Sequence, residues 1–323
     1  DSSSAASDVY KRQLLFYCYS KIKDPIKFRR DHLRFCIENN IVGRIIISDE
    51  GINGTISGKE IDCKSYIDEI KRKKTFNDID FKIDSVDRNV FKKINVRIKD
   101  EIVNSGIKNK KIIQKRGNYI EPSEFKSILE QQSEDVCILD VRSRYEYEIG
   151  KFKNAITLDI DNFREFPDAI DEIETKISKE KKIITYCTGG VKCEKASAFL
   201  KENGYKNVYQ LHGGIIKYGI EENGKDFNGK CYVFDNRIVK EVNNINPNII
   251  SKCYVTGKKS DRMVNCANAE CNKHIPLSDD GAKIYNGCCS EKCLKSDKVR
   301  KFDGTGFYQK KLNGYNPYQV LKY

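Results

Sequence analysis

A short loop around Cys187 has the residue types and the spacing of a reactive cysteine site. A run of β-branched and aromatic residues ends at Tyr186, and the loop continues as Cys187, Thr188, Gly189, Gly190, Val191 and Lys192. A helix is expected to follow at residues 194–203. Inward-turned backbone amides, the start of a helix and the charge of Lys192 all favour a thiolate over a thiol. We therefore predict that Cys187 is a catalytic cysteine, either nucleophilic or redox-active.

The remainder of this loop is predicted to bind an anion or a substrate. Amides that converge at the start of a helix form a cradle for negative charge, which assigns this role to residues 188–192. The alternative is a structural cysteine packed at a strand end, as free cysteines often are. A strand, a cysteine, a glycine pair, a cation and a helix start coincide here, and this combination favours the reactive cysteine.

Cys193 lies six residues after Cys187 and has two interpretations. It is either the resolving thiol that would pair with an oxidised Cys187, or a small side chain that packs in the first helical turn. The sequence is compatible with both.

A second group of cysteines lies near the end of the chain. Six of the thirteen cysteines fall in one short window: Cys253, Cys266, Cys271, Cys288, Cys289 and Cys293. The odd total and the lack of an export signal favour thiol chemistry or metal binding over a disulfide framework. The spacings Cys266-x4-Cys271 and Cys289-x3-Cys293 suit a tetrahedral zinc site, whereas the absence of a C-x-x-C pair favours unmetallated cysteines.

The elements that must position Cys187 alternate between strands and helices. Strands are expected at residues 136–140, 156–158, 182–186 and 208–211, each followed by a polar turn or an amphipathic stretch. This alternation predicts a doubly wound parallel sheet covered by helices, within a domain of residues 119–222. Ligands of such sheets bind beyond the carboxyl ends of the strands, which is where Cys187 lies in this prediction.

The preceding residues 14–107 form a separate unit in this prediction. A strand at 14–19, a helix that begins near Pro25, a hairpin over 44–57, a second helix and a strand at 78–85 give the order βαββαβ. That order is typical of a ferredoxin-like domain. One more strand is expected within residues 94–103, before a polar linker.

The two ends of the chain are interpreted from composition. Residues 1–13 are small and polar, and we interpret them as a non-native leader. Residues 223–323 show weak periodicity and form a Cys-rich, basic C-terminal extension. Its final residues 300–323 hold five Lys or Arg and six aromatic residues, which could contact phosphates and unpaired bases, or form a solvated tail.

Charge and hydropathy narrow the class of protein. The net charge of +12 favours a polyanionic partner. No apolar run reaches the roughly 18 residues of a membrane span, so we expect a cytoplasmic protein without membrane contact.

Four motifs in order resemble the rhodanese family. They are Leu139-Asp140-Val141-Arg142, Tyr145-Glu146-Tyr147-Glu148-Ile149-Gly150, the Cys187 loop, and Leu211-His212-Gly213-Gly214. The resemblance implies that Cys187 is the catalytic cysteine and that residues 187–192 are the active loop. Lys192 stands where the family usually has Arg, which keeps the charge but gives up bidentate anion binding.

Other polar residues of these motifs are expected to be structural. We expect Asp140 and Arg142 to stabilise the fold as an ion pair, as many such pairs do outside active sites. His212 is expected to hold the turn before Gly213.

Motifs on both sides of this unit extend the resemblance to residues 14–293. Residues 49–55, 193–197 and 264–268 are similar to those of the tRNA uridine hydroxylases, rhodanese-containing bacterial proteins that make 5-hydroxyuridine at the wobble position. This resemblance implies oxidation of a uridine in the anticodon stem-loop of tRNA, with molecular oxygen as co-substrate and with Cys187 required. The family often has a cysteine where this chain has Thr256, which implies a partly lost metal site at Cys253.

The residues themselves are compatible with this chemistry. A thiolate can add to C6 of uracil and make C5 electron-rich, or it can carry an oxidised sulfur. The sequence has no dinucleotide-binding fingerprint, haem motif or iron-binding triad, so the cofactor that would activate oxygen is unknown from the sequence.

Two other functions are compatible with parts of the sequence. In a sulfurtransferase, Cys187 would form a persulfide and its loop would bind the sulfur donor. In a non-enzymatic tRNA-binding module, the rhodanese unit would be inert, but the intact cysteine argues against that reading.

Overall fold

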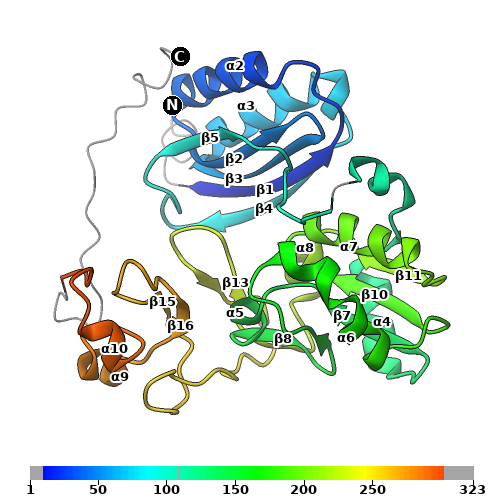
Figure 1. Ribbon diagram of the computed structural model, residues 1–323. Coiled ribbons are helices and arrows are strands. Elements are labelled where there is room, and N and C mark those ends of the chain that lie inside the picture. Colours follow the sequence, from blue (N-terminus) through cyan, green and yellow to red (C-terminus); the bar gives the residue numbers. More distant parts are fainter. Residues whose placement is uncertain (1–9, 108, 302–323) are drawn as a thin grey trace.

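The computed structural model describes residues 10–107 and 109–301 of the chain (Figure 1). An N-terminal sheet with two long helices is followed by a central sheet with helices, and then by a C-terminal part with short elements. In Figure 1 the N-terminal sheet lies against the central domain, and its helices point away from that domain.

The N-terminal sheet has the strand order β4-β1-β3-β2-β5, and only β2 and β5 are parallel neighbours. With its two helices this is the ferredoxin-like arrangement that the element order predicts, so that prediction is confirmed. The elements are β1 (Lys11–Tyr19), α2 (Pro25–Glu38), β2 (Val42–Ser48), β3 (Gly51–Lys59), α3 (Glu60–Lys71), β4 (Asp80–Val86) and β5 (Ile94–Ile98).

The first strand begins earlier than the sequence predicts. β1 starts at Lys11, and Gln13 is buried and pairs in register with Ser57 of β3 and Asp84 of β4. Residues 11–13, which the sequence assigns to the expected leader, therefore belong to the sheet, and the non-native origin of residues 1–13 stays a prediction. Residues 11–13 are all polar, so the alternation of apolar and polar side chains that marks a strand does not extend to them.

Strand β1 contributes to two different cores. Leu14 and Phe16 point toward α2 and α3 and are fully buried in the N-terminal core. Successive side chains of a strand point to opposite faces, so Leu15, Tyr17 and Tyr19 face the central domain. Leu15 packs with the apolar residues of that domain. The N-terminal sheet therefore covers the central domain with its open face.

The central sheet is parallel throughout, in the order β6-β11-β10-β7-β9, which confirms the predicted doubly wound sheet. Apolar clusters fill both faces, with Ile183 on one side and Ile184 and Tyr186 on the other. Its strands are β6 (Asn118–Ile120), β7 (Val136–Asp140), β9 (Ile156–Thr157), β10 (Lys182–Tyr186) and β11 (Val208–Leu211). Its helices are α4 (Pro122–Gln131), α5 (Arg144–Tyr147), α6 (Ile170–Lys176), α7 (Val191–Glu202) and α8 (Gly214–Glu222).

The C-terminal part consists of short elements joined by loops, as weak periodicity predicts. Strand β12 (Phe227–Gly229) pairs with β8 (Gly150–Phe152), so the extension begins as part of the central domain. The remaining elements are β13 (Cys231–Tyr232), β14 (Val239–Lys240), β15 (Met263–Asn265), β16 (His274–Pro276), α9 (Asp279–Ile284) and α10 (Glu291–Leu294), with 3-10 turns earlier in the chain at η1 (Lys74–Phe76), η2 (Lys110–Lys115) and η3 (Phe163–Ala169).

Within residues 10–107 and 109–301, no helix has the length and apolar character needed to cross a membrane. The aromatic and basic tail that the sequence suggests for RNA contact lies almost entirely in residues 302–323, outside the described residues.

Candidate functional site

Cys187 follows β10 directly and lies at the carboxyl end of the parallel sheet, as predicted. The amide of Gly190 donates a hydrogen bond to the Cys187 sulfur at 3.2 Å, and Gly190 has a φ of +100°, which L side chains rarely adopt. The backbone amide of Ile215 in α8 donates a hydrogen bond to the Cys187 carbonyl at 3.0 Å. A Cβ on Gly214 would lie 2.4 Å from that carbonyl oxygen, so only glycine fits there.

Helix α7 begins at Val191, three residues before the predicted start at residue 194. Val191 and Lys192 therefore belong to its first turn, and the irregular part of the loop consists of residues 187–190. The helix start is consequently closer to the sulfur than the sequence predicts. Its positive end favours a thiolate there.

The surroundings of Cys187 stabilise its thiolate. Burial by itself would raise the pKa of Cys187, but a hydrogen bond from the Cys193 side chain, the Lys192 charge and the amides of both residues outweigh it and lower the pKa to about 7. Burial and the nearby Cys187 raise the pKa of Cys193. Cys193 is therefore a protonated donor to Cys187, and its role as a resolving thiol stays a prediction.

Lys192 contributes its charge from a fixed position. Its ammonium lies 2.6 Å from a carboxylate oxygen of Glu146, which is buried and completes a capping box at α5. The Thr188 hydroxyl donates to the carbonyl of Tyr232 at 3.4 Å. These partners hold the loop on its flanks, and the role of residues 188–192 in substrate binding stays a prediction.

The N-terminal sheet covers this loop with residues that sequence reasoning missed. The Tyr17 hydroxyl donates to Glu194 at 2.8 Å, and the Tyr19 hydroxyl donates to the Val191 carbonyl at 3.2 Å. Burial, and then the Glu194 charge, raise the pKa of Tyr17, so its hydroxyl stays protonated. A Cβ on Gly189 would lie 2.8 Å from Leu15. Cys187 itself is 1% exposed.

Lys82 of β4 is a buried cation on the same face. Its ammonium lies 3.0 Å from Asp80 and 5.0 Å from the centre of the Tyr17 ring. Burial lowers the pKa of Lys82, while Asp80 and, more weakly, Cys187 oppose that change. In the sequence, Lys82 is marked only by its place in a strand that alternates between apolar and polar residues. A lysine in such a strand usually points to solvent, so the pattern does not indicate that Lys82 is buried.

Motifs that are far apart in the sequence meet at the interface between the two sheets. Lys195 is buried and lies 3.0 Å from Glu50 and 2.6 Å from Glu101. Its neighbour Glu194 accepts hydrogen bonds from Tyr17 and, at 2.6 Å, from Tyr119. Glu50 belongs to the motif at residues 49–55, and Glu194 and Lys195 belong to the motif at residues 193–197. The interface therefore brings the two motifs into contact.

Asp140 and Arg142 form the expected structural ion pair. Both are fully buried, and their closest charged atoms are 2.7 Å apart. The Tyr186 hydroxyl donates to Asp140 at 2.6 Å, and Arg142 donates to the Gly150 carbonyl. The pair therefore ties β7 to β10 and to the segment that follows α5.

His212 has the expected place at the turn before Gly213. One ring nitrogen lies 2.6 Å from Glu121, and the ring packs on Tyr119 with 4.8 Å between ring centres. These contacts link the end of β11 to the start of α4.

Four of the six C-terminal cysteines come together. The sulfurs of Cys266, Cys271, Cys289 and Cys293 all lie within 4.8 Å of one another. Cys253 and Cys288 lie outside this group, so the structure brings together four of the six candidate ligands. Cys253 instead accepts hydrogen bonds from Ser278 at 3.2 Å and from the Thr256 amide at 3.4 Å. The four cysteines of the group form a set of four without Cys253, and a partly lost site at Cys253 stays a prediction.

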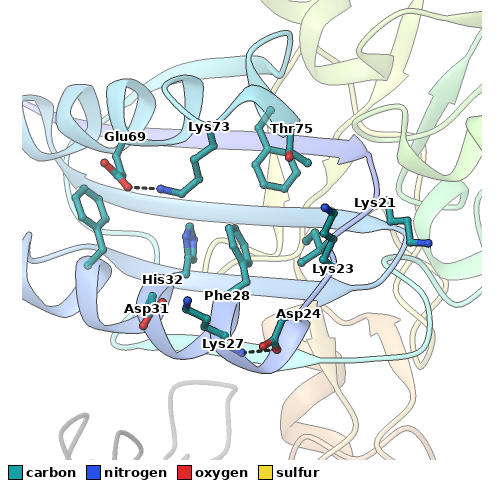
Figure 2. Close-up of a pocket in the computed structure, with 13 residues that line it drawn as sticks. Lys21, Lys23, Asp24, Lys27, Phe28, Asp31, His32, Glu69, Lys73 and Thr75 are labelled. Atoms are coloured by element: carbon teal, nitrogen blue, oxygen red, sulfur yellow. Dashed lines mark hydrogen bonds and ion pairs between the residues drawn. The ribbon is translucent and has the colours of Figure 1, made fainter.

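A cavity of about 440 Å³ lies beside α2 and the end of α3 (Figure 2). Lys23, Lys27 and Lys73 line it together with Asp24 and Glu69, so its charge is mixed. It lies on the helix-covered side of the N-terminal sheet, opposite the face that covers Cys187. It is therefore not part of the Cys187 site.

Comparisons with known proteins agree with this three-part organisation. Family models match residues 12–102 as a UPF0176 acylphosphatase-like domain, 121–221 as a rhodanese-like domain and 228–294 as a rhodanese C-terminal domain. The N-terminal match is described as acylphosphatase-like, and it covers the domain that we describe as ferredoxin-like.

Several relatives cover nearly the whole chain. A tRNA uridine(34) hydroxylase of Cytophaga hutchinsonii is 51% identical over 96% of this chain and 98% of its own. Proteins of the same name from Staphylococcus haemolyticus and Aster yellows witches'-broom phytoplasma are 45% and 44% identical, over 90% and 87% of this chain and 90% and 91% of their own. The chain therefore belongs to the family of the tRNA uridine(34) hydroxylases.

Proposed function

We propose that this protein hydroxylates the wobble uridine of tRNA to 5-hydroxyuridine, with Cys187 as the reactive group. Relatives that bear this activity in their name match nearly the entire chain. The observation that carries the role of the cysteine is the Cys187 loop, where an amide at 3.2 Å, a lysine and a helix start favour the thiolate. Because its substrate is tRNA, we expect the protein to act in the cytoplasm.

The reaction converts the C5–H bond of uracil to C5–OH, which is a two-electron oxidation of the base. With molecular oxygen as co-substrate, one oxygen atom enters the base. The other becomes water after it takes up two electrons and two protons from a reductant.

We infer that the Cys187 thiolate adds to C6 of uracil. The bond between sulfur and C6 places electron density at C5, which then forms a bond to one atom of molecular oxygen. The reductant supplies two electrons and two protons, which break the O–O bond and release the other oxygen atom as water. Loss of the C5 proton and release of the sulfur restore the aromatic base and the thiolate. Covalent addition of this kind replaces one difficult step by easier ones. A pKa of about 7 keeps a large fraction of the cysteine in the reactive form near neutral pH.

The enclosure of Cys187 bears on how the base enters. Leu15, Tyr17 and Tyr19 cover the loop, and Cys187 is 1% exposed. A uracil ring can reach the sulfur only when the N-terminal sheet or the loop shifts. A base of the anticodon loop is unpaired, so it can leave its stack and enter such an opening at small cost. Closure over the base would then exclude water.

The test uses tRNA from cells that lack the native activity, complemented with this protein or with its Cys187→Ser variant. Cys137→Ser is the matched control, because Cys137 lies on the neighbouring strand β7, outside the loop. Mass analysis of nucleosides should detect 5-hydroxyuridine or its derivatives with the wild type and the control, and none with Cys187→Ser.

Other outcomes separate the alternatives. Full activity of Cys187→Ser would show that the cysteine is not the reactive group. Absence of the modified nucleoside, together with turnover of thiosulfate or persulfide that depends on Cys187, would instead identify a sulfurtransferase. Circular dichroism of the purified variants verifies that they are folded.

A further inference from the structure

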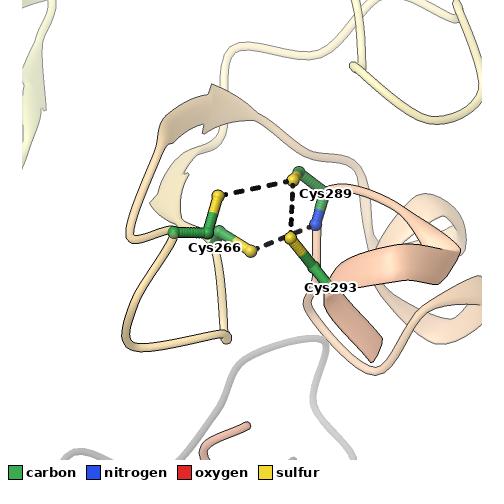
Figure 3. A group of neighbouring side chains, drawn as sticks. Cys266, Cys289 and Cys293 are labelled. Atoms are coloured by element: carbon green, nitrogen blue, oxygen red, sulfur yellow. Dashed lines mark hydrogen bonds between the residues drawn. The ribbon is translucent and has the colours of Figure 1, made fainter. Parts of the chain in front are cut away.

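We propose that Cys266, Cys271, Cys289 and Cys293 form a structural site for one Zn²⁺ ion. The first pair lies in the loop between β15 and β16, and the second pair lies at α10. Figure 3 shows Cys266 on one segment facing Cys289 and Cys293 on the other. A shared ion would therefore join two segments that are separated by β16 and α9.

The distances between the sulfurs fit one tetrahedral ion. Zinc binds thiolate sulfur at about 2.3 Å, which places the sulfurs of a tetrahedron about 3.8 Å apart. The sulfur of Cys289 lies 3.7 Å from that of Cys271 and 3.5 Å from that of Cys293. All four sulfurs lie within 4.8 Å of one another.

The same distances argue against two other arrangements. A disulfide requires about 2.05 Å between sulfurs, and all of these cysteines are free. In a cluster of four irons each cysteine binds a different iron, which spreads the sulfurs farther apart than a single ion does. Four thiolates with no oxygen or nitrogen ligand favour zinc over hard ions such as Mg²⁺ or Ca²⁺.

The backbone around the cluster suits thiolates. The Cys289 amide donates to the Cys266 sulfur at 3.3 Å. The Ser290 hydroxyl accepts from the Cys293 amide at 3.3 Å and so fixes the start of α10. Such second-layer hydrogen bonds orient metal ligands. Since the chain supplies all four ligands, no position is left for a substrate, and the site is structural.

The position of the cluster explains what the ion would stabilise. Cys266 follows β15 directly, and β15 pairs with β16. In β16, His274 lies 2.8 Å from the Tyr232 hydroxyl and packs on Tyr145. The Tyr232 carbonyl in turn accepts the hydrogen bond from Thr188 in the Cys187 loop. The ion would thus stabilise the hairpin that packs behind this loop.

The experiment measures metal in the full-length protein purified from zinc-supplemented cells. Elemental analysis should find about one zinc per chain. Cys271→Ser and Cys293→Ser should lose most of it, whereas the control variants Cys253→Ser and Cys288→Ser should keep it, because those two cysteines lie outside the group. Equal loss in the controls, or a wild type without zinc, would overturn the proposal.

A second measurement remains decisive if a ligand variant does not fold. Wild-type protein reconstituted with Co²⁺ should show the intense visible bands of tetrahedral tetrathiolate cobalt, and added Zn²⁺ should remove them. A Co²⁺ spectrum without these bands would contradict the site. Neither measurement depends on hydroxylase activity, so this proposal and the proposed function can fail separately.

Discussion

The protonation state of Cys187 results from opposing effects of a few neighbours. Burial disfavours the thiolate, while Lys192, Cys193 and the amides at the start of α7 favour it and prevail. The side chain of Lys192 is held by Glu146 at 2.6 Å, so its charge stays near the loop. The protonation state of Cys187 therefore depends on a residue that need not touch the substrate.

Replacement of Lys192 by Met should raise the pKa of Cys187. The thiolate loses the nearby positive charge of Lys192, which lowers the pKa of Cys187 in the wild type. We expect the midpoint to rise from about 7 by roughly one pH unit or more. The thiolate fraction increases with pH, so the variant holds less thiolate at pH 7 than the wild type.

Thiolate absorbance in the ultraviolet measures this midpoint after subtraction of the Cys187→Ser spectrum. Lys206→Met is the control, because Lys206 forms an exposed ion pair with Glu180. A midpoint that stays at its wild-type value in Lys192→Met would show that Lys192 does not control Cys187.

At the scale of elements, the junction of β10 and α7 is shaped by its contact with β1. Gly190 needs its positive φ to turn its amide toward the Cys187 sulfur. A Cβ on Gly190 would lie 2.9 Å from the Tyr17 hydroxyl. The same glycine therefore serves the geometry of the loop and the close approach of the N-terminal sheet.

Gly190→Ala should cost more stability than Gly204→Ala. Both glycines have positive φ, +100° and +89°, so both variants carry the roughly 1–2 kcal/mol penalty of an L residue in that region. At Gly204 a Cβ would meet only Lys179, at an ordinary 3.7 Å. At Gly190 the clash with Tyr17 adds to the penalty. Urea denaturation measures the difference, and equal losses would refute the clash.

The buried charges between the two sheets give another prediction. Lys195→Met leaves Glu50 and Glu101 without their shared cation, and loss of one partner of a buried pair costs about 3–5 kcal/mol. Adding Glu101→Gln to this variant should restore part of the loss, because contacting residues couple by about 0.5–3 kcal/mol.

Urea denaturation of the single and double variants measures this coupling. The exposed pair of Lys206 and Glu180 is the comparison, since Lys206→Met should cost about 0–1 kcal/mol. Simple additivity of the Lys195 and Glu101 substitutions would mean that the buried ion pair does not hold the sheets together.

At the scale of the whole molecule, two sheets enclose the Cys187 loop. The central domain supplies the cysteine and its loop, and the N-terminal sheet supplies Leu15, Tyr17, Tyr19 and Lys82. The chain carries a net charge of +12, which suits a tRNA substrate. In the proposed function, a single base of that substrate enters between the sheets.

Binding of an anticodon stem-loop should weaken steeply with salt. Each neutralised phosphate releases counterions, so several contacts predict a loss of about tenfold or more in affinity between about 50 and about 200 mM salt. Fluorescence anisotropy with a labelled stem-loop measures this slope. A variant truncated after residue 301 tests the contribution of residues 302–323. A smaller salt dependence of its affinity than that of the full-length chain would assign phosphate contacts to those residues. Affinity that does not change with salt would contradict an interface built on phosphates.

The sequence by itself determined features that depend on near neighbours. The Cys187 loop is continuous in the chain, Asp140 and Arg142 are two residues apart, and the run of β-branched and aromatic residues that ends at Tyr186 indicates a buried strand. The motif order also identified the family. Local geometry fixes such features, so they can be read from a short stretch of sequence.

Only the tertiary structure decided which distant residues meet. Glu50 and Lys195 are 145 positions apart, and Tyr17 and Glu194 are 177 positions apart. Spacing likewise left six cysteines as candidate ligands, and folding brings four of them together. Contacts of this kind depend on how the N-terminal sheet packs on the central domain and how the C-terminal loops fold back, which neither alternation nor spacing specifies.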